Sequence, residues 1–436
     1  MRNQENKDLN TIKTSTKNRA IAISITEGRV IRDLLDGGLL KLLNDNNINV
    51  VIFTPAARVK SFVEQWASAN VCIELLKPVE WNTRMQRLHF LRSRIGGVAP
   101  KAVKWFSKLE TLLTPVDGDY VKLLSNYNVS LLAITHPLHH GEHSLLRAAA
   151  ELRLPTIGIV RSWDNLYKGL RTRPDVLAVW NRVNADEATK LMWYSRTSVR
   201  VIGGTQFDPY FNTKSLPSRT DFFHSLELDV DRPLITLATL GSFLHMYDET
   251  YLVDLLLESI QAGEIDGNPQ IIIRLHPSSR KEYFEKYMCN PNVRLSYVSE
   301  YVPSIGWTMT RAQVVELASI MLHSDVVVSP GSTITIETAI FDTPTIVPIF
   351  HTYQPELGER MFSSHLRTHF RRLLEQDLVA IVNSMPELSA GINRALQDRS
   401  WYKEQRKKLV EDYITYTDGR SVARLSELML SMLPRA

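Results

Sequence analysis

The stretch DVVVSPGSTITIETAIFDTPTIVP, residues 325–348, decides the fold class. Its apolar run 326–328 is typical of a buried strand, which ends in the turn 329–332. A helix is expected at 333–341, and after one tight turn at Asp342 the apolar run 343–350 predicts the next strand. Two buried strands joined by a helix form the crossover unit of a parallel sheet, so this stretch predicts an α/β protein.

Short apolar runs of the same kind recur on both sides of this stretch, at residues 20–25, 49–55, 129–137, 155–163, 175–181, 199–204, 233–242, 270–277 and 293–298. Helical patterns separate them, beginning with an amphipathic helix at 29–44. Residues 211–221 contain Pro, Ser and Thr without an apolar period, which indicates a joint near 212–232. We therefore expect two Rossmann-like, doubly wound parallel-sheet domains that face a cleft.

The expected boundaries follow from these patterns. Residues 1–18 are expected to be a flexible tail, 19–215 an N-terminal domain, 232–400 a C-terminal domain, and 401–436 helices that can pack back on the N-terminal domain. In open α/β sheets, ligands bind beyond the carboxyl ends of the strands. The polar residues that follow each strand are therefore the candidates for a functional site.

The composition of the 436 residues excludes several classes of protein. A formal net charge of +4 with 22% charged and 44% hydrophobic residues argues against disorder and against a strongly basic nucleic-acid binder. Two cysteines exclude a disulfide scaffold and a cysteine-rich zinc module. The first 19 residues lack the apolar core of a secretory signal, and no stretch approaches the roughly 18 apolar residues of a membrane span. We expect a cytoplasmic protein.

The turn at the end of strand 326–328 is the first candidate site. Pro330 and Gly331 permit a sharp turn, and a helix that starts directly after them offers free N–H groups to a phosphate. The residues predicted to hold the donor here are Ser329, Gly331, Ser332 and Thr333, with Glu337 one turn into the helix, where it can accept from ribose hydroxyls. The alternative is an ordinary capped junction between a strand and a helix.

Two more strand ends in the C-terminal half carry suitable groups. Arg274 and His276 lie two residues apart and so share one face of a strand, where a cation and an imidazole suit a diphosphate. Gly241 and Ser242 follow the first strand of this half and permit close approach of a phosphate. The alternative is a histidine packed at the sheet edge with an arginine that extends to solvent.

The N-terminal half offers candidate catalytic and acceptor-binding residues. Glu27 and His136 each follow a strand, and either can act as a general base on an acceptor hydroxyl. Four histidines and Glu142 within 136–143 also suggest a metal site, but the spacing is that of a loop, so no metal is predicted. Further candidates after later strands are Asp164 as a catalytic residue and Trp163, Asn165 and Asp208 as acceptor-binding residues.

Several well-known motifs are absent from the sequence. It contains no Walker A loop, no GxSxG elbow, no HExxH and no GxGxxG after a strand. These absences argue against a P-loop enzyme, an α/β-hydrolase, a zincin metalloprotease and a typical NAD enzyme.

Together these segments resemble the GT-B glycosyltransferase superfamily. RLHP at 274–277, SPGST at 329–333, Glu337 and the tail TDGRSVARL at 417–425 resemble the branch of the CDP-glycerol glycerophosphotransferases and UDP-N-acetylglucosamine 2-epimerases. SWDNL at 162–166 and the segment 203–210 resemble bacterial surface-carbohydrate proteins. The resemblance implies a donor held by the C-terminal domain, a base supplied by the N-terminal domain and no bound metal or cofactor.

The expected function is transfer of a sugar from a nucleotide-activated donor to a glycan or lipid-linked acceptor in surface polysaccharide synthesis. Three alternatives stay open: a CDP-glycerol-type phosphotransferase, a 2-epimerase-like or phosphoribosyl-diphosphate-dependent enzyme, and a non-catalytic scaffold with this fold. Basic and aromatic residues in 81–108 can lie against a membrane surface, although a solvated helical face explains them as well. No nucleic-acid partner is expected.

Overall fold

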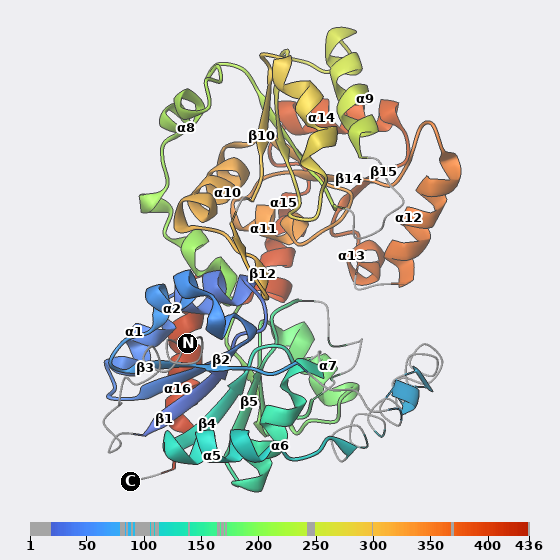
Figure 1. Cartoon of the computed structure of the whole chain (residues 1–436). Helices are drawn as coiled ribbons and strands as arrows, with labels where there is room; N and C mark the ends of the chain where they lie inside the picture. Colours follow the sequence, from blue (N-terminus) through green and yellow to red (C-terminus); the bar gives the residue numbers. More distant parts are fainter. Residues whose placement is uncertain are drawn as a thin grey trace. The chain divides into compact units, whose positions relative to one another are not determined.

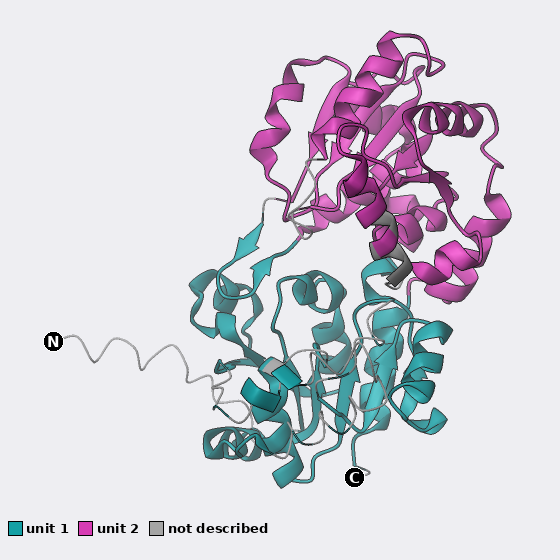
Figure 2. Cartoon of the chain, turned by 90° about the vertical axis from the view of Figure 1, so that its right-hand side faces the viewer, with its two compact units in different colours: residues 1–208, 300–308, 420–436 teal, residues 209–299, 309–419 magenta. Residues whose placement is uncertain are grey.

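The computed structural model describes residues 19–78, 113–137, 140–163, 172–241, 249–298, 300–367 and 370–434, together with residues 83, 86–88, 90–91, 105, 109, 166 and 170. The chain forms two compact units, residues 1–208, 300–308 and 420–436 in the first and 209–299 and 309–419 in the second (Figure 2). The chain therefore passes between the units four times. The predicted tail 1–18 lies outside the described residues, and the predicted domain roles stay predictions.

Unit 1 is built around a parallel sheet (Figure 1). Among the described residues it has seven strands in the order β3-β2-β1-β4-β5-β6-β7. The strands are β1 (Ala20–Ser24), β2 (Asn49–Thr54), β3 (Val71–Leu75), β4 (Val129–Ile134), β5 (Thr156–Ile159), β6 (Val176–Val179) and β7 (Val199–Val201). The order reverses between β1 and β4, which makes this pair the switch point of a doubly wound sheet.

Alternate residues of these strands fill two separate cores. Ile21 and Ile23 of β1 pack into one core, whereas Ala20 and Ala22 pack into the other, as the two-residue period of a strand requires. The surrounding helical elements are η1 (Ile31–Leu35), α1 (Leu39–Asn44), η2 (Pro55–Arg58), α2 (Lys60–Trp66), α5 (Gly118–Asn126), η4 (His140–Glu142), α6 (His143–Glu151), α7 (Arg182–Lys190), η6 (Arg196–Ser198), η7 (Thr205–Phe211) and α16 (Ser421–Ser431).

The helix predicted at 29–44 is wrong in its continuity. The structure breaks it into the π-helix η1 and the short helix α1. Gly38 lies between them with a φ of 87°, a left-handed conformation that ends a helix and that glycine adopts without strain. An added Cβ at Gly37 would lie 2.9 Å from a methyl of Val422, so this turn packs closely against α16.

Unit 2 contains the second parallel sheet. In the part of the chain that the structure describes, its six strands have the order β10-β9-β8-β13-β14-β15. They are β8 (Leu234–Ala238), β9 (Gln270–Arg274), β10 (Val293–Ser296), β13 (Val326–Val328), β14 (Thr345–Pro348) and β15 (Ala380–Val382). The order reverses between β8 and β13, so each unit is doubly wound, as the sequence predicted.

Helices cover both faces of this second sheet. Residues of α9 and α14 pack in the core on one face, and residues from α8 and α10 pack on the other. The helical elements are η8 (Thr213–Ser215), α8 (Arg219–Ser225), α9 (Thr250–Gln261), η10 (Lys281–Tyr283), η11 (Glu285–Cys289), α10 (Arg311–His323), α11 (Ile334–Ile340), α12 (Pro355–Arg367), α13 (Arg371–Glu375), α14 (Met385–Gln397), α15 (Lys403–Leu409) and η12 (Val410–Ile414). Helix α8 lies within the segment that sequence patterns suggested was a joint without helical period.

A small hairpin, β11 (Tyr301–Val302) and β12 (Gly306–Trp307), belongs to unit 1 although its neighbours in sequence belong to unit 2. It packs on the turn that follows β1. Gly28 donates its backbone N–H to the carbonyl of Ile305 at 2.7 Å, and the guanidinium of Arg29 lies 5.6 Å from the ring centre of Trp307. The hairpin thereby holds the turn after β1 in place.

Gly28 leaves no room for a side chain beneath this hairpin. A Cβ at position 28 would lie 2.3 Å from the carbonyl oxygen of Trp307. We predict that Gly28→Ala lowers the free energy of unfolding by about 1–3 kcal/mol, the usual range for overpacking. Gly118→Ala is the matched control, because an added Cβ meets nothing within 4 Å at the start of α5. Urea unfolding measures both, and an equal effect of the two substitutions would contradict the packing argument.

Candidate functional site

The switch point of unit 1 brings together the ends of β1 and β4. Glu27 follows β1, and His136 follows β4. The two side chains are in contact, with His136 Nδ1 3.0 Å from Glu27 Oε1. Each has 26% of its side chain exposed, so a substrate can reach both. The structure thus brings together two of the three residues that sequence patterns suggested as the general base.

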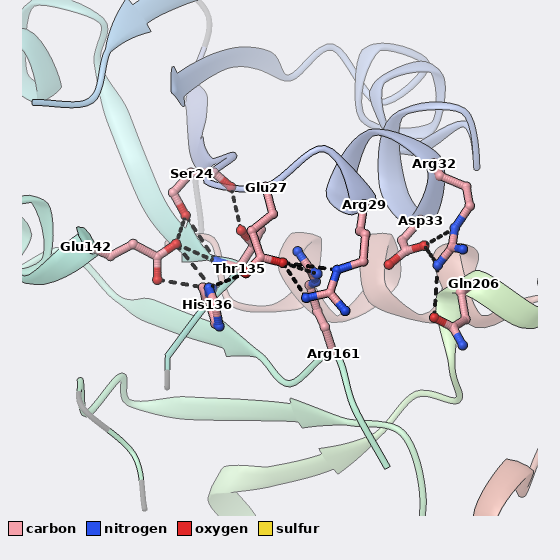
Figure 3. A network of polar contacts seen from close by, with 10 residues as sticks. All are labelled: Ser24, Glu27, Arg29, Arg32, Asp33, Thr135, His136, Glu142, Arg161 and Gln206. Atoms are coloured by element: carbon pink, nitrogen blue, oxygen red, sulfur yellow. Dashed lines mark hydrogen bonds and ion pairs between the residues drawn. The ribbon is translucent and has the colours of Figure 1, made fainter. Parts of the chain in front are cut away.

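The buried carboxylate of Glu142 connects the two strand ends (Figure 3). It accepts hydrogen bonds from the hydroxyl of Ser24 at the end of β1 and from the N–H groups of Thr135 at 3.0 Å and His136 at 3.1 Å. Thr135 in turn donates its hydroxyl to the carbonyl of Ser24 at 2.9 Å. This network fixes the backbone that carries His136.

Glu27 is the centre of a second network. Its Oε2 accepts from Arg29 Nη2 at 2.7 Å and from Arg161 Nη2 at 3.0 Å, while Oε1 faces His136. Burial raises the pKa of Glu27, but the hydrogen bond with His136 and the charges of Arg161 and Arg29 outweigh it and hold the pKa well below its usual range. Glu27 is therefore ionised at neutral pH.

An ionised Glu27 prepares His136 to accept a proton. With a proton on Nδ1 donated to Glu27, the second ring nitrogen of a neutral imidazole carries the lone pair. The pair has the composition of a general base with an orienting carboxylate.

The pKa of Glu142 is shifted in the opposite direction to that of Glu27. It has no exposed surface, and burial raises its pKa although Ser24, Thr135 and His136 all donate to it. Two carboxylates thus contact His136, one through its ring and one through its backbone, with pKa values shifted in opposite directions. Such a separation is typical of sites where acid and base roles are divided.

The switch point of unit 2 carries the predicted donor-binding residues. Gly241 follows β8 with a φ of 77°, and an added Cβ would lie 2.6 Å from Nδ1 of His276. The carboxylate of Glu249 accepts from the N–H groups of Leu240 at 2.6 Å and Gly241 at 3.1 Å. Glycine is required here by both conformation and space. The neighbouring candidate Ser242 lies outside the described residues.

His276 has a defined tautomer in its neutral form. The backbone N–H of Ser278 lies 3.1 Å from Nδ1 and can only donate, so Nδ1 is the acceptor and Nε2 carries the proton. The N–H of His276 itself donates to the hydroxyl of Thr239 at 2.8 Å, which links the ends of β8 and β9. A neutral His276 therefore presents an N–H donor, the group that a phosphate oxygen requires.

Arg274 is oriented differently from what the diphosphate prediction assumed. It is 6% exposed, and its Nη1 donates to the hydroxyl of Ser296 in β10 at 2.7 Å. Ser296 donates in turn to Glu316 of α10. These contacts give Arg274 a part in joining the sheet to α10, and its predicted contact with a diphosphate stays a prediction.

The turn after β13 has the backbone form that the sequence suggested. Gly331 has a φ of 100°, and Ser329 is fully buried with its hydroxyl 3.4 Å from that of Ser332. Ser332 accepts from the N–H of Ile334 at 3.4 Å, whereas Thr333 makes no capping bond through its side chain. Glu337 is 7% exposed within α11, and its predicted contact with a ribose stays a prediction.

A cavity of about 520 Å³ lies in unit 2, at the carboxyl ends of β14 and β15. Its volume is in the range of small-molecule sites. The lining comes from the segment after β14, from the start of α12 and from the start of α14, and includes His351, Thr352, Glu359, Asn383 and Ser384. None of these residues was among the sequence-based candidates.

The remaining candidates are placed as follows. Trp163 is 3% exposed, and its carbonyl accepts from Asn184 at 2.9 Å. The carboxylate of Asp208 accepts from the N–H groups of Ser421 and Val422, both at 2.9 Å, and so caps the N-terminus of α16. Asp164 and Asn165 lie outside the described residues. The acceptor-binding roles of Trp163, Asn165 and Asp208 stay predictions.

The comparisons with known proteins agree with this architecture. Residues 232–431 match the sequence model of the family described as CDP-Glycerol:Poly(glycerophosphate) glycerophosphotransferase. The teichoic acid glycerol-phosphate primase of Staphylococcus aureus (strain NCTC 8325 / PS 47) is 26% identical over 141 residues, which are 32% of this chain and 36% of that protein. The chain thus matches about a third of the length of this curated relative.

Solved structures match nearly the whole chain. The UDP-GlcNAc 2-epimerase from Neisseria meningitidis, bound to UDP-GlcNAc, has a TM-score of 0.56 at 13% identity, with 95% of this chain and 100% of that chain covered. A variant of the wall teichoic acid polymerase TagF has a TM-score of 0.55 at 11% identity, covering 97% and 90%. The calicheamicin glycosyltransferase CalG4 has a TM-score of 0.51 at 12% identity, covering 96% and 99%.

The chain has the GT-B fold. This confirms the predicted fold class, and the family whose model matches residues 232–431 is one of transferases. Of the described residues, no group of three His, Cys, Asp or Glu is arranged to hold a metal ion. Within the same residues, no helix is long and apolar enough to cross a membrane.

Sequence reasoning missed three members of the site in unit 1. Glu142 was considered only within the histidine-rich stretch, and Arg29 and Arg161 were not among the candidates. A signal was present for Arg161, because it lies near the end of the predicted strand 155–163, as His136 lies near the end of 129–137. Glu27 lies 109 residues from His136 and 134 residues from Arg161 in the sequence, and one sequence does not show that residues so far apart are in contact.

The opposite pKa shifts predict opposite effects of pH on stability. Because the pKa of Glu142 is raised above 4.5, the folded chain binds more protons there, and its contribution declines as pH rises from about 4.5 through the folded value. Glu27 has a lowered pKa, so its contribution to the free energy of unfolding is present above pH 4.5. That contribution is lost only as the pH falls below 4.5.

We therefore predict that Glu142→Gln flattens the decline in unfolding free energy above pH 4.5, measured by urea unfolding between pH 4.5 and 8. Glu27→Gln, the matched control, should lower stability by a constant amount over that range and by less below pH 4.5. Parallel curves for the wild-type chain and Glu142→Gln across the whole range would show that Glu142 does not titrate there.

Proposed function

We propose that this chain transfers glycerol phosphate, or a closely related polyol phosphate, from a CDP-activated donor to a hydroxyl of a surface-polymer acceptor. The observation that carries the proposal is the family match over 232–431, which includes nearly all of the sheet and the donor-site candidates of unit 2. The similarity to a glycerol-phosphate primase supports the same reaction. The comparisons favour this alternative over the sugar transfer that the sequence first suggested.

The proposed reaction is a displacement at phosphorus. The acceptor hydroxyl oxygen forms a bond to the glycerol-bearing phosphorus of the donor, the bond from that phosphorus to the bridging oxygen breaks, and CMP leaves with the bonding electrons. The proton of the acceptor hydroxyl passes to His136, whose Nδ1 contact with Glu27 leaves the other ring nitrogen as the base.

Unit 2 supplies groups suited to the nucleotide. His276 offers an N–H from Nε2, and the turns at Gly241 and Gly331 bring backbone close to a bound phosphate. The cavity of about 520 Å³ at the ends of β14 and β15 has room for a nucleoside. Basic and N–H groups of this kind stabilise a leaving phosphate without a metal ion, so we propose a metal-independent reaction.

The acceptor is proposed to be a glycan or a lipid-linked glycan. Most of the basic and aromatic residues in 81–108 lie outside the described residues, and peripheral contact of this segment with a membrane stays a prediction, as does a cytoplasmic location. The epimerase-like, phosphoribosyl-diphosphate-dependent and scaffold alternatives are separated from the proposal by the products formed.

The nucleotide product distinguishes phosphate transfer from sugar transfer. With CDP-glycerol and an acceptor preparation from teichoic acid primers, we predict release of CMP in equal amounts with acceptor-bound glycerol phosphate, in the presence of EDTA, measured by chromatography. A sugar transfer would instead release a nucleoside diphosphate from a nucleotide sugar. Release of free sugar without acceptor would favour the epimerase-like alternative, and no product with any donor would favour the scaffold.

His136→Ala and His276→Ala should each lower turnover at least about 100-fold, because general-base and leaving-group assistance contribute about 10²–10⁴-fold each. Only His276→Ala should also weaken the binding of CDP-glycerol, measured by calorimetry. His224→Ala is the matched control, because this histidine is exposed on α8 and belongs to neither site. Full activity of both variants would refute the assigned roles.

A further inference from the structure

Arg161 is a buried cation with unused hydrogen-bonding capacity. It follows β5 in unit 1, and only 8% of its side chain is exposed. Nη2 donates to Glu27, but Nε and Nη1 are buried without a hydrogen-bond partner among the described residues. Buried donors of a charged group are rarely left without an acceptor, so each needs an explanation.

Arg161 shares its counter-ion with a second guanidinium group. The guanidinium groups of Arg29, Arg32 and Arg161 make their ion pairs with two carboxylates, those of Glu27 and Asp33. Arg29 and Arg161 reach the same oxygen of Glu27 from different elements (Figure 3). Two guanidinium groups thus share one carboxylate oxygen, and an added anion could pair with both of them.

These two guanidinium groups lie next to the proposed base. Glu27 contacts both guanidinium groups through Oε2 and the ring of His136 through Oε1. Arg29 is 45% exposed, so the cluster is open to a ligand on that side. A group bound by Arg161 and Arg29 would thus be a near neighbour of the hydroxyl from which His136 takes a proton.

We propose that Arg161 and Arg29 form an anion subsite for a phosphate group of the acceptor, a few bonds from its reacting hydroxyl. The inference rests on the proposed function, because it assigns this unit to the acceptor. Guanidinium groups bind phosphate through paired N–H donors, and the unpaired nitrogens of Arg161 supply donors that no side chain among the described residues uses. The acceptor is then a glycan or lipid-linked glycan that already carries a phosphate group near its reacting hydroxyl.

The competing explanation is that Arg161 is only a structural counter-ion. Both Glu27 and Asp33 stabilise its charge, while burial lowers its pKa. A purely structural role accounts for Nη2 but not for Nε and Nη1, which a carboxylate could have satisfied in a closed ion pair. The anion subsite accounts for all three nitrogens.

The test titrates the full chain with glycerol 3-phosphate and with neutral glycerol, followed by calorimetry. We expect glycerol 3-phosphate to bind and glycerol not to bind. Arg161→Gln should weaken the binding of glycerol 3-phosphate roughly tenfold to hundredfold, the usual effect of a lost charged hydrogen bond. Arg182→Gln is the matched control, because Arg182 is exposed on α7 of the same unit.

A second variant protects the test against misfolding. If Arg161→Gln does not fold, Arg29→Gln decides, since this side chain is half exposed and its loss should also weaken binding. Unchanged binding in the folded variants, or loss of binding in His276→Ala instead, would place the anion in unit 2 and overturn the subsite. Absence of glycerol 3-phosphate binding to the wild-type chain at millimolar concentration would overturn it as well.

The donor is tested separately on the same proteins. CDP-glycerol binding that survives in Arg161→Gln supports a subsite confined to the acceptor. If CDP-glycerol fails to bind and glycerol 3-phosphate still depends on Arg161, the anion subsite is retained and the proposed donor is wrong. If CDP-glycerol is turned over but Arg161→Gln binds glycerol 3-phosphate as tightly as the wild-type chain does, the proposed function is retained and the subsite is wrong.

Discussion

The site in unit 1 depends on one buried carboxylate, that of Glu142. Its oxygens accept from the hydroxyl of Ser24 and from two consecutive backbone N–H groups, at Thr135 and His136, so the ends of β1 and β4 share one acceptor. Without this acceptor, the N–H groups at the switch point would lose a hydrogen-bond partner in a region closed to water, which costs about 1–3 kcal/mol for each group left unpaired. The same bonds set the backbone from which the ring of His136 reaches Glu27. The carboxylate of Glu142 therefore holds the two strand ends together and also positions the proposed base.

The fold was predictable because strands of a buried parallel sheet have continuous apolar sequences that are easily recognised. Continuous apolar runs such as 129–134 and 271–273 have no other common explanation when helical patterns alternate with them. Two strands of the large sheets were missed, β3 and β15, and both lie at an edge of their sheet, where burial demands less apolar sequence. The helix at 29–44 was predicted as continuous because its apolar period runs through Gly37 and Gly38. The spacing of apolar residues does not show that Gly38 takes a left-handed backbone conformation, which ends the helix.

The candidate site was predictable only in part. Glu27 and His136 were identified because both follow strands, and the topology of the sheet then places them together. Glu142, Arg29 and Arg161 gain their importance from partners that only the folded chain brings near. Asp208 illustrates the converse: a polar residue after a strand looked like a ligand contact, and its carboxylate caps a helix that begins 213 residues later. Position at a strand end indicates where to look, and contacts decide what a residue does.

The two units differ in the charged groups at their strand ends, and this difference suits the separate roles proposed for them. In unit 2 the groups at these strand ends are a glycine turn, a histidine N–H and a serine-rich turn, which are donors suited to the diphosphate of the proposed donor. In unit 1 the switch point holds fully charged guanidinium and carboxylate groups around one imidazole. A carboxylate kept ionised by two arginines contacts the ring of His136, and Nε and Nη1 of Arg161 retain donor capacity for a further anion. Under the proposed function, the unit that supplies the base also holds the anion subsite, so the groups that orient the base would also select an anionic acceptor.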